Sequence, residues 1–491
     1  MRHKTKHNMK ILLAIILSII LCPCTNAQKI ITLEEAVEHV VQHTRRARSI
    51  RLSYENSTLR FHNFQKDFLP SISFKIAPFS FNRSFERLQN ASDGSYSYVE
   101  DYNGSSSCGM FLRQKISATG GYIEMGTSLY YLREFNSNRN SFNSRPLYIS
   151  LSQPLWGGRK SFRLNKAVEI LNFSVATKRL IKSLADCQKE TATLYLQAYI
   201  ARNNVAYSKL MSLASDTILK HAKLELQYGR IAPHEYKQVE LQWAEHAYQA
   251  SLAKSTYEQS MHLLANYLES DNNFLLADIT IKNHPFINVD IAYQHALSNN
   301  PQLLENELLL ATARKRLYDA KNETRTSSSI SLNYGINQYA HSISMAYRHP
   351  SQQQNAQITL SLPIFNWGIN RNKRRMAEND FQQELINQEQ SRNDFKLYIY
   401  RLSHDCNNAA KHLELALQAY QTAEETYIAM TRQYALARIT IADLQETRNT
   451  LIEYKKTFDE ALKNYVNDYY ELRVLTLYDF KKHTDINFII Y

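Results

Sequence analysis

Two short stretches of the sequence decide the fold: "LSQPLWGG", Leu151–Gly158, and "LSLPIFNWG", Leu360–Gly368. Each begins as a strand-like run and turns at a corner made of proline, an aromatic residue and glycine. The residues that follow, 159–228 and 369–491, contain neither glycine nor proline. Because glycine and proline are the strongest helix breakers, these clean stretches predict long helices. The sequence therefore predicts that a strand passes into a long helix at two matching places.

The composition indicates a chain dominated by helices. Among 491 residues there are only 11 glycines and 10 prolines, both below average usage. Within the helical stretches a seam of residues recurs at alternating spacings of three and four, as in Leu444, Thr447, Leu451, Tyr454, Phe458 and Ala461. A sustained repeat of this kind predicts coiled-coil packing. At 1.5 Å per residue, about 65 helical residues would form a rod of roughly 100 Å.

Two turns interrupt the long helices at matching places. They are "YGRIAPHEY", Tyr228–Tyr236, and "LARITIADL", Leu436–Leu444. Gly229 supplies the left-handed conformation that ends a helix, and an acidic residue follows near the start of the next helix, where the macrodipole favours it. Each long helical region is therefore predicted to be a hairpin of two helices.

Strand-like segments fill the regions before the corners. They alternate in polarity or carry aromatic and β-branched residues: Ser71–Phe81, Gly109–Ile116, Tyr122–Leu132, Leu147–Trp156, Ser329–Ala340, Ser342–Arg348 and Gln357–Phe365. Polar linkers such as Asn90–Ser107 indicate exposed loops. Segments of about ten residues with alternating faces suit a barrel that spans an outer membrane. Beyond the N-terminus no segment approaches 18 consecutive apolar residues, so a closed β-barrel is the expected way to cross a membrane.

The two halves of the chain match in order. "LEEAVEHVVQHT", Leu33–Thr44, corresponds to "VDIAYQHALSNN", Val289–Asn300, and "PSISF", Pro70–Phe74, corresponds to "SSISL", Ser328–Leu332. Each half runs helix, strands, corner, long helix, tight turn, long helix. The sequence therefore indicates a duplicated unit of mixed α and β structure.

The N-terminus has the features of a secretory signal peptide. Basic residues precede an apolar core, Ile11–Leu21, and Ala27 is the small residue before cleavage. A membrane anchor would need about 20 apolar residues, whereas a lipoprotein signal stays open because Cys22 and Cys24 follow the core. Removing residues 1–27 takes away four basic residues and no acidic one, so the net charge falls from +12 to +8. This moderate basicity does not indicate a nucleic-acid partner.

In this arrangement the chain resembles the TolC family of outer-membrane efflux proteins, over about residues 30–475. The resemblance implies a homotrimer in the outer membrane of a Gram-negative bacterium. Each family protomer contributes two strand pairs to a shared twelve-stranded β-barrel. Its helices form a hollow coiled-coil barrel that continues into the periplasm. Residues 86–133 depart from this plan by adding a glycine-rich hairpin region to the first strand pair.

The resemblance places a boundary at each change of structure. The expected parts are signal peptide 1–27, periplasmic helix 28–68, strands and extracellular loops 69–156, helical hairpin 157–285, periplasmic helix 286–325, strands 326–366, helical hairpin 367–475 and C-terminal tail 476–491.

The function that the resemblance implies is that of a passive export duct. The trimer would be the outer-membrane conduit of a tripartite efflux or type I secretion system, engaging a periplasmic adaptor and an inner-membrane pump. The alternative is a periplasmic coiled-coil scaffold without a channel, in which the strands form a small soluble domain. No constellation for catalysis or for a cofactor appears, so the chain is not expected to be an enzyme.

The two turns are the candidate sites. In the family they form the periplasmic tip, where the entrance is gated and the adaptor binds. The expected adaptor contacts are Gly229, Arg230, Ile231, Ala232, Ala437, Arg438, Ile439 and Thr440. The expected gate residues are Glu235, Tyr434, Arg438 and Asp443, with Arg438 taking the place of the family's gate arginine, which falls at Ile439. The alternative for the two acidic residues is that they only begin their helices.

No metal site is expected elsewhere. His39 and His43 lie four residues apart on a predicted helix, a spacing that could hold a metal. Because no third ligand is in view, packed or solvated histidines are the favoured interpretation. Cys108, Cys187 and Cys406 are too far apart in sequence to form a metal pattern or a disulfide framework.

Overall fold

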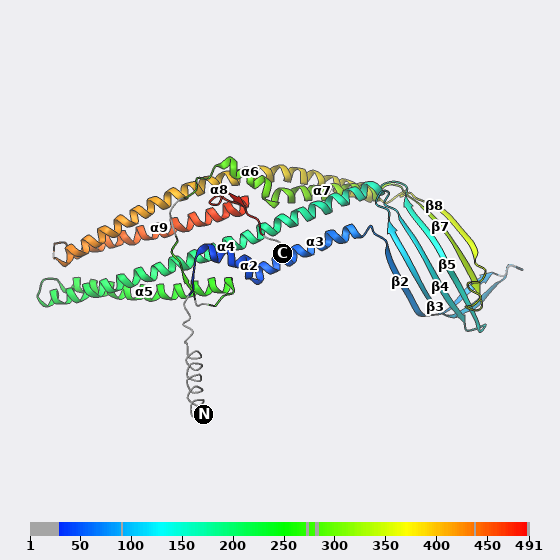
Figure 1. Cartoon of the computed structure of the whole chain (residues 1–491), viewed down its shortest axis with the longest axis horizontal. Helices are drawn as coiled ribbons and strands as arrows, with labels where there is room; N and C mark the ends of the chain where they lie inside the picture. Colours follow the sequence, from blue (N-terminus) through cyan, green and yellow to red (C-terminus); the bar gives the residue numbers. More distant parts are fainter. Residues whose placement is uncertain (1–28, 90–91, 272–273, 280–283, 437, 489–491) are drawn as a thin grey trace, which may run out of the picture.

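The computed structural model shows a long helical rod that ends in a β-sheet (Figure 1). It describes the whole chain except residues 1–28, 90–91, 272–273, 280–283, 437 and 489–491. The expected signal peptide, residues 1–27, therefore lies outside the described residues. The part of the chain that is described contains no helix long and apolar enough to cross a membrane.

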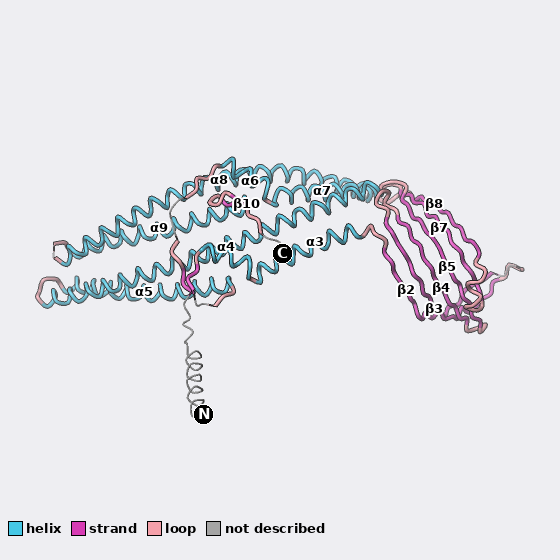
Figure 2. Tube along the Cα trace, viewed as in Figure 1, coloured by secondary structure: helices cyan, strands magenta, loops and turns pink. Residues whose placement is uncertain are grey.

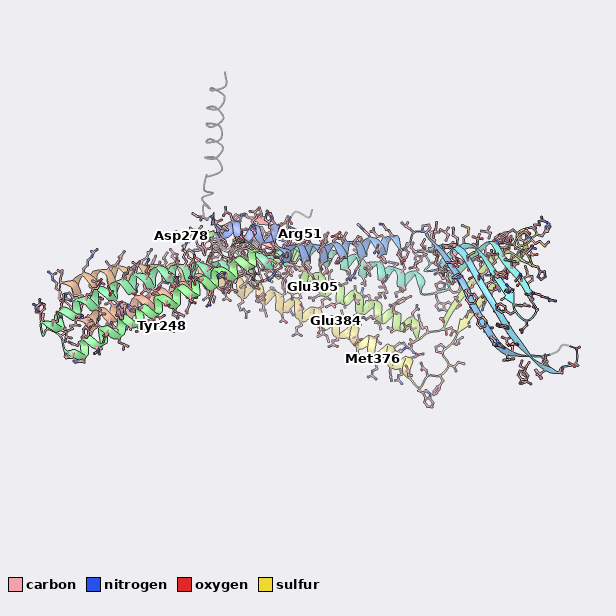
Figure 3. All side chains as sticks on the ribbon, turned by 90° about the horizontal axis from the view of Figure 1, so that it is seen from below. Arg51, Tyr248, Asp278, Glu305, Met376 and Glu384 are labelled. Carbon is pink, nitrogen blue, oxygen red and sulfur yellow. The ribbon has the colours of Figure 1, made fainter. Side chains whose placement is uncertain are left out.

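Eight helices build the rod in the part of the chain that the structure describes. They are α2 (Leu33–His43), α3 (Arg45–Lys66), α4 (Gly158–Gln227), α5 (Pro233–Leu268), α6 (Val289–Asn299), α7 (Pro301–Glu323), α8 (Ile369–Ala435) and α9 (Ile441–Thr476). The long helices occupy the stretches without glycine and proline, as predicted. Along the rod α4 packs on α5 and α8 on α9, and toward the sheet α3 packs on α4 and α7 on α8 (Figures 1 and 3).

The main core lies where the short helices pack on the long ones. Its largest fully buried side chains include Leu184, Tyr195 and Leu196 of α4, Leu264 of α5, Leu413 of α8 and Leu462 of α9. The Tyr195 hydroxyl lies 2.9 Å from the carbonyl oxygen of Ile31 and 3.0 Å from that of Ala277. These carbonyls flank a short parallel pair, β1 (Lys29–Ile31) with β6 (Phe274–Leu276). The hydroxyl thus ties this strand pair to α4 inside an otherwise apolar core.

One antiparallel sheet of six strands stands at the end of the rod (Figure 2). Its strands are β2 (Ser71–Gln89), β3 (Tyr96–Lys115), β4 (Tyr122–Glu134), β5 (Arg139–Pro154), β7 (Ser327–Ala340) and β8 (Ser351–Ser361), paired in that order. Because β5 pairs with β7, the strands of both halves form a single sheet. Within one chain, β2 and β8 each keep an unpaired edge.

In the part of the sheet near the helices, one face is apolar and the other is polar. The pairing register puts the following side chains on one face: Ile72, Phe74 and Ile76 of β2, Met110 and Leu112 of β3, Met125 and Leu129 of β4, Ile149 and Leu151 of β5, Ile330 and Leu332 of β7, and Ile358 of β8. The other face carries Ser71, Ser73, Ser107, Arg113, Glu124, Ser128, Ser150, Ser331, Asn333, Asn355 and Gln357. Several apolar side chains are exposed, among them Ile72 at 73% and Ile358 at 72%.

A β-bulge preserves this separation along β2. The register shifts between Ala77 and Ser80, so two residues of β2 lie opposite one residue of β3. The extra residue shifts the alternation of side chains by one position. Phe79 and Phe81 therefore lie on the same apolar face as Ile76, although Ile76 is even-numbered and the two phenylalanines are odd-numbered.

The hairpin region expected within residues 86–133 is present as β3 and β4, so the sheet has six strands per chain where the resemblance implied four. Two expectations about the strands are wrong. Much of the expected loop Asn90–Ser107 is strand, because β3 begins at Tyr96 and pairs along its length with β2. Ser342–Arg348, expected as a strand, is a run of turns that joins β7 to β8. Alternation of polarity within a segment does not decide whether that segment becomes a strand, because the outcome depends on the strands that are available to pair with it.

Candidate functional site at the hairpin tips

The two predicted turns lie together at the end of the rod that faces away from the sheet (Figure 1). One joins α4 to α5 and the other joins α8 to α9. The four long helices are nearly matched in length: α4 has 70 residues and α8 has 67, while α5 and α9 have 36 each. The matched lengths bring both tips to the same level.

The first tip is built around Gly229. Its φ of 68° is left-handed, and a Cβ there would meet nothing within 4 Å. The Arg230 amide donates to the Glu225 carbonyl at 2.8 Å, and the Gly229 amide donates to the Leu226 carbonyl at 3.1 Å. This is the hydrogen-bond pattern that closes a helix through a left-handed residue. The glycine is needed for its backbone conformation alone.

The second tip repeats the same closure. The Arg438 amide donates to the Gln433 carbonyl at 3.0 Å, five residues back, as Arg230 does in the first tip. Ala437, which occupies the position of Gly229 in the sequence match, lies outside the described residues. The two tips therefore share the hydrogen bond from an arginine amide to the carbonyl five residues earlier.

The two acidic residues begin their helices. A carboxylate oxygen of Glu235 accepts from the Ala232 amide at 2.8 Å. Asp443 accepts from the Thr440 amide at 2.9 Å and from the Thr440 hydroxyl at 2.7 Å. Hydrogen bonds from the side chain and then the backbone of Thr440 lower the pKa of Asp443. Both carboxylates thus satisfy helix N-termini that would otherwise keep free amides.

Tyr434 and Ile439 pack inside the tip. Both contact an apolar cluster centred on Ala423, Tyr427, Leu444 and Leu451. The Tyr434 ring meets His221 of α4 edge to face at 6.1 Å between centroids. Burial, followed by the charge of Glu225, raises the pKa of Tyr434. In a single chain the Tyr434 ring links α8 to α4.

Four expected contact residues are on the surface. Gly229, Arg230, Arg438 and Thr440 are exposed, whereas Ile231, Ala232 and Ile439 are half-buried. Within the described residues Arg438 forms no ion pair with Glu235 or Asp443. One chain therefore presents two arginines, Arg230 and Arg438, at the end of the rod.

Just above the tips, His246 of α5 meets Arg448 of α9. The His246 Nδ1 lies 3.2 Å from the Met211 carbonyl of α4, and its Nε2 lies 3.1 Å from an Arg448 guanidinium nitrogen. Burial and then the charge of Arg448 lower the pKa of His246. The neutral histidine thus accepts a hydrogen bond that joins the two hairpins. Nothing in the sequence pairs His246 with Arg448, because the two residues lie about two hundred positions apart.

A buried ion pair within α9 lies against α4. Lys455 is only 8% exposed, and its Nζ lies 2.8 Å from an Asp459 carboxylate oxygen and also contacts Asn204. Burial raises the pKa of Asp459, and Lys455 opposes that effect. A charged pair at this depth is retained only with satisfied partners, so it fixes the position of one hairpin against the other.

Neither a metal nor a disulfide site is found among the residues that the structure describes. They contain no group of three or more histidine, cysteine or acidic side chains that could hold a metal ion. The rings of His39 and His43 lie 5.0 Å apart on α2. Cys108, Cys187 and Cys406 are free thiols, and Cys187 and Cys406 are buried.

Comparison with known proteins agrees with this architecture. The model of the outer membrane efflux protein family matches residues 292–476, which is most of the second repeat. The chain resembles outer membrane efflux proteins. The resemblance expected from the sequence is therefore confirmed. No curated protein sequence matches the chain significantly.

Solved outer-membrane channels share the fold over nearly the full length. The Campylobacter jejuni CmeC outer membrane channel is 15% identical, with a TM-score of 0.67, over 93% of this chain and 87% of that one. The outer membrane protein VceC of Vibrio cholerae is 11% identical, with a TM-score of 0.62, over 91% and 95%. The open state of the Neisseria gonorrhoeae MtrE outer membrane channel is 12% identical, with a TM-score of 0.56, over 90% and 88%. At these identities the likeness is one of fold.

Proposed function

We propose that three copies of this chain form a passive export duct through an outer membrane. The observation that carries the proposal is the six-stranded sheet with one apolar face, one polar face and two unpaired edges. In lipid an open edge leaves backbone amides and carbonyls unsatisfied, so a lone sheet is not viable there. Pairing β8 of one copy with β2 of the next closes the sheet. The apolar face then meets lipid and the polar face encloses water.

The rod also needs neighbours. Large apolar side chains are exposed along the long helices, including Leu210, Leu213, Leu241, Tyr248, Met376, Ile386, Leu397 and Leu415. Figure 3 shows Tyr248 on α5 and Met376 on α8 projecting from the rod. Exposed apolar surface of this extent marks protein interfaces. Rods from three copies, packed side by side, bury it and continue the duct into the periplasm.

The tips are the proposed entrance. Arg230, Arg438 and Thr440 are exposed at the end of the rod and, with the neighbouring tip residues, form the surface offered to a periplasmic adaptor of an inner-membrane pump. Glu235, Tyr434, Arg438 and Asp443 gate the entrance when three tips meet. Opening separates the α8–α4 contact made by Tyr434, because that contact holds the two hairpins together at the tip.

Fractionation tests the proposed duct against a soluble scaffold. A duct sediments with outer membranes and migrates as a trimer that heat dissociates. A chain without its signal peptide that stays monomeric and monodisperse in detergent-free buffer contradicts the proposal.

Conductance in planar bilayers tests the gate. The double variant Tyr434→Phe, Glu235→Ala is expected to raise single-channel conductance, because it weakens the closed tip. Tyr98→Phe, exposed near the end of β3 that lies far from the tips, is the matched control and is expected to conduct as the unaltered protein does. Equal conductance in all three proteins would remove these two residues from the gate.

A further inference from the structure

The added hairpin occupies a definite place in the first repeat. In the second repeat the chain passes from β7 to β8 by a short run of turns. In the first repeat the matching strands are β2 and β5, and β3 and β4 lie between them. All six strands lie side by side in Figure 1. The insertion therefore widens the sheet from within and leaves both edges unchanged.

The hairpin has the same two faces as the rest of the sheet. Met110 of β3 and Met125 of β4 continue the apolar face beside Phe74 of β2 and Ile149 of β5. Ser107 and Ser128 continue the polar face. The register between β3 and β4 runs without a break from Asn103↔Glu134 to Lys115↔Tyr122. A flap lying in water gains nothing from an apolar face, whereas a segment of membrane wall requires one.

The turn between β3 and β4 is fitted to the corner before α4. A Cβ at Gly158 would lie 2.2 Å from the Thr119 carbonyl oxygen, and a Cβ at Gly120 would lie 2.7 Å from the Gly158 Cα. The Thr119 hydroxyl lies 2.6 Å from a side-chain oxygen of Gln153, whose amide nitrogen lies 3.2 Å from the Thr119 carbonyl oxygen. Backbone thus packs directly on backbone, which only glycine permits.

The matching corner of the second repeat shows the same helix start without a turn packed against it. Both long helices follow a left-handed glycine, Gly157 before α4 and Gly368 before α8. The next residue is Gly158 in the first repeat and Ile369 in the second, and Ile369 is 53% exposed. A Cβ at Gly368 would meet nothing within 4 Å. The second glycine of "QPLWGG" is thus explained by the turn that packs against it.

We propose that the β3–β4 hairpin is part of the barrel wall, so that three copies enclose eighteen strands where the resemblance implied twelve. This inference rests on the proposed trimeric duct. The diameter of a barrel grows roughly linearly with its strand number, so eighteen strands give a barrel about half again as wide as twelve. Barrels of 16 to 18 strands enclose an open aqueous channel. The membrane part of this duct would then be a wide mouth, and selection by size would fall to the helical tips.

Cysteine labelling in native outer membranes tests the placement of β3. Cys108 lies on the apolar face and Ser107 on the polar face, and Cys187 and Cys406 are buried. Native Cys108 is compared with Ser107→Cys in a Cys108→Ser background, using a membrane-impermeant maleimide. The wall position predicts rapid labelling at 107 and labelling at least about tenfold slower at 108, since alternate residues of a membrane strand face water and lipid.

The same comparison on β7 is the matched control. Ser331→Cys on the polar face and Ile330→Cys on the apolar face, both in the Cys108→Ser background, report on a strand that both repeats share. If β7 alternates and β3 labels equally at 107 and 108, the hairpin lies outside the wall and the inference is wrong. If β7 does not alternate either, the sheet does not span a membrane and the proposed duct is wrong.

A deletion tests the width. Replacing residues 83–138 by Asn-Gly joins Asn82 of β2 to Arg139 of β5. These two residues lie at the same level of the sheet, because Asn82 pairs with Asn103, Asn103 with Glu134 and Glu134 with Arg139. Averaged electron-microscopy images of the trimer, viewed down its axis, are expected to show the barrel diameter reduced by about a third. An unchanged diameter would contradict the eighteen-stranded wall. If the deletion variant fails to assemble, the labelling experiment still decides the question.

Discussion

The two repeats differ in the sheet and agree along the rod. The first has four strands and the second two, yet α4 and α8 differ by only three residues and α5 and α9 do not differ at all. A rod of side-by-side hairpins needs tips at one level, so a change in helix length would misplace a tip. A sheet accepts another hairpin more easily, because each added strand brings its own ladder partners. The fold is thus constrained at the tips and adaptable in the sheet.

The corners show how the adaptation is accommodated. Trp156 donates its indole N–H to the Thr326 carbonyl at 2.8 Å and is half exposed, whereas Trp367 is 86% exposed. In the first repeat the corner is held by the neighbouring loop and by the inserted turn. In the second repeat the corner stands free in a single chain. This difference suggests which substitutions should affect the stability of one repeat more than that of the other.

The largest expected effect is at the buried Lys455–Asp459 pair, which belongs to the second repeat and contacts Asn204 of the first. Lys455→Ala leaves Asp459 buried without its partner, which destabilises a protein by about 3–5 kcal/mol. The thermal unfolding midpoint in detergent, followed by circular dichroism, is expected to fall sharply. The double variant Lys455→Met, Asp459→Leu removes both charges and is expected to lie close to the unaltered protein. Equal losses in the two variants would show that packing matters here and charge does not.

A smaller loss of stability is expected when Gly158 of the first corner is replaced by isoleucine, the residue at the matching position of the second corner. Gly158→Ile inserts a side chain against the backbone of Thr119 and Gly120, and overpacking of this kind destabilises by about 1–3 kcal/mol. The measurement is the temperature at which the trimer dissociates. Ile369→Gly is the control for a change at the first position of a long helix.

The same substitution in the deletion background sharpens the comparison. With residues 83–138 replaced, the turn that blocks a side chain at 158 is gone, so Gly158→Ile is expected to be nearly neutral there. An equal loss in both backgrounds would show that the glycine serves the helix and not the inserted turn.

An effect of about 1–2 kcal/mol is expected at the first tip. Gly229→Ala puts a Cβ on a residue with φ of 68°, which costs about 1–2 kcal/mol in strain. Because the surrounding space is open, strain is the whole effect, and it is measured by thermal unfolding. Gly229→Asn is the control, since asparagine tolerates the left-handed conformation and is expected to lose less.

Much of this structure was predictable because it depends on local signals. The absence of glycine and proline predicted α4, α5, α8 and α9, and the sequence match predicted both tips. The strands of the first repeat were harder, because Tyr96–Ser107 is polar and becomes strand only through its pairing with β2. The second glycine of the first corner also had no local explanation, since its reason is a turn nearly forty residues earlier.

The tip contacts show the same limit. Glu235 and Asp443 were placed at helix starts by their spacing from the turns, and the structure puts them in capping interactions. Arg448 carried no signal, because its partner His246 lies on another hairpin about two hundred residues away. Sequence alone locates the elements, whereas the contacts that join the two repeats depend on how the helices pack.

The smallest expected effect concerns pH at that same junction. The pKa of His246 is lowered in the folded protein by burial and by Arg448, while the hydrogen bond to the Met211 carbonyl and then the charge of Glu245 act in the opposite direction. The unfolded chain therefore takes up a proton first as the pH falls below the usual histidine value of about 6.5. The junction between the hairpins is then expected to lose stability at mildly acidic pH and to be fully stable above neutrality. Thermal unfolding at pH 8 and pH 5.5 measures the change, and His246→Gln, which keeps a hydrogen-bonding side chain without titrating, is expected to reduce the difference between the two pH values. An unaltered difference in that variant would assign the pH dependence to other groups and leave the His246–Arg448 contact without a role in holding the two repeats together.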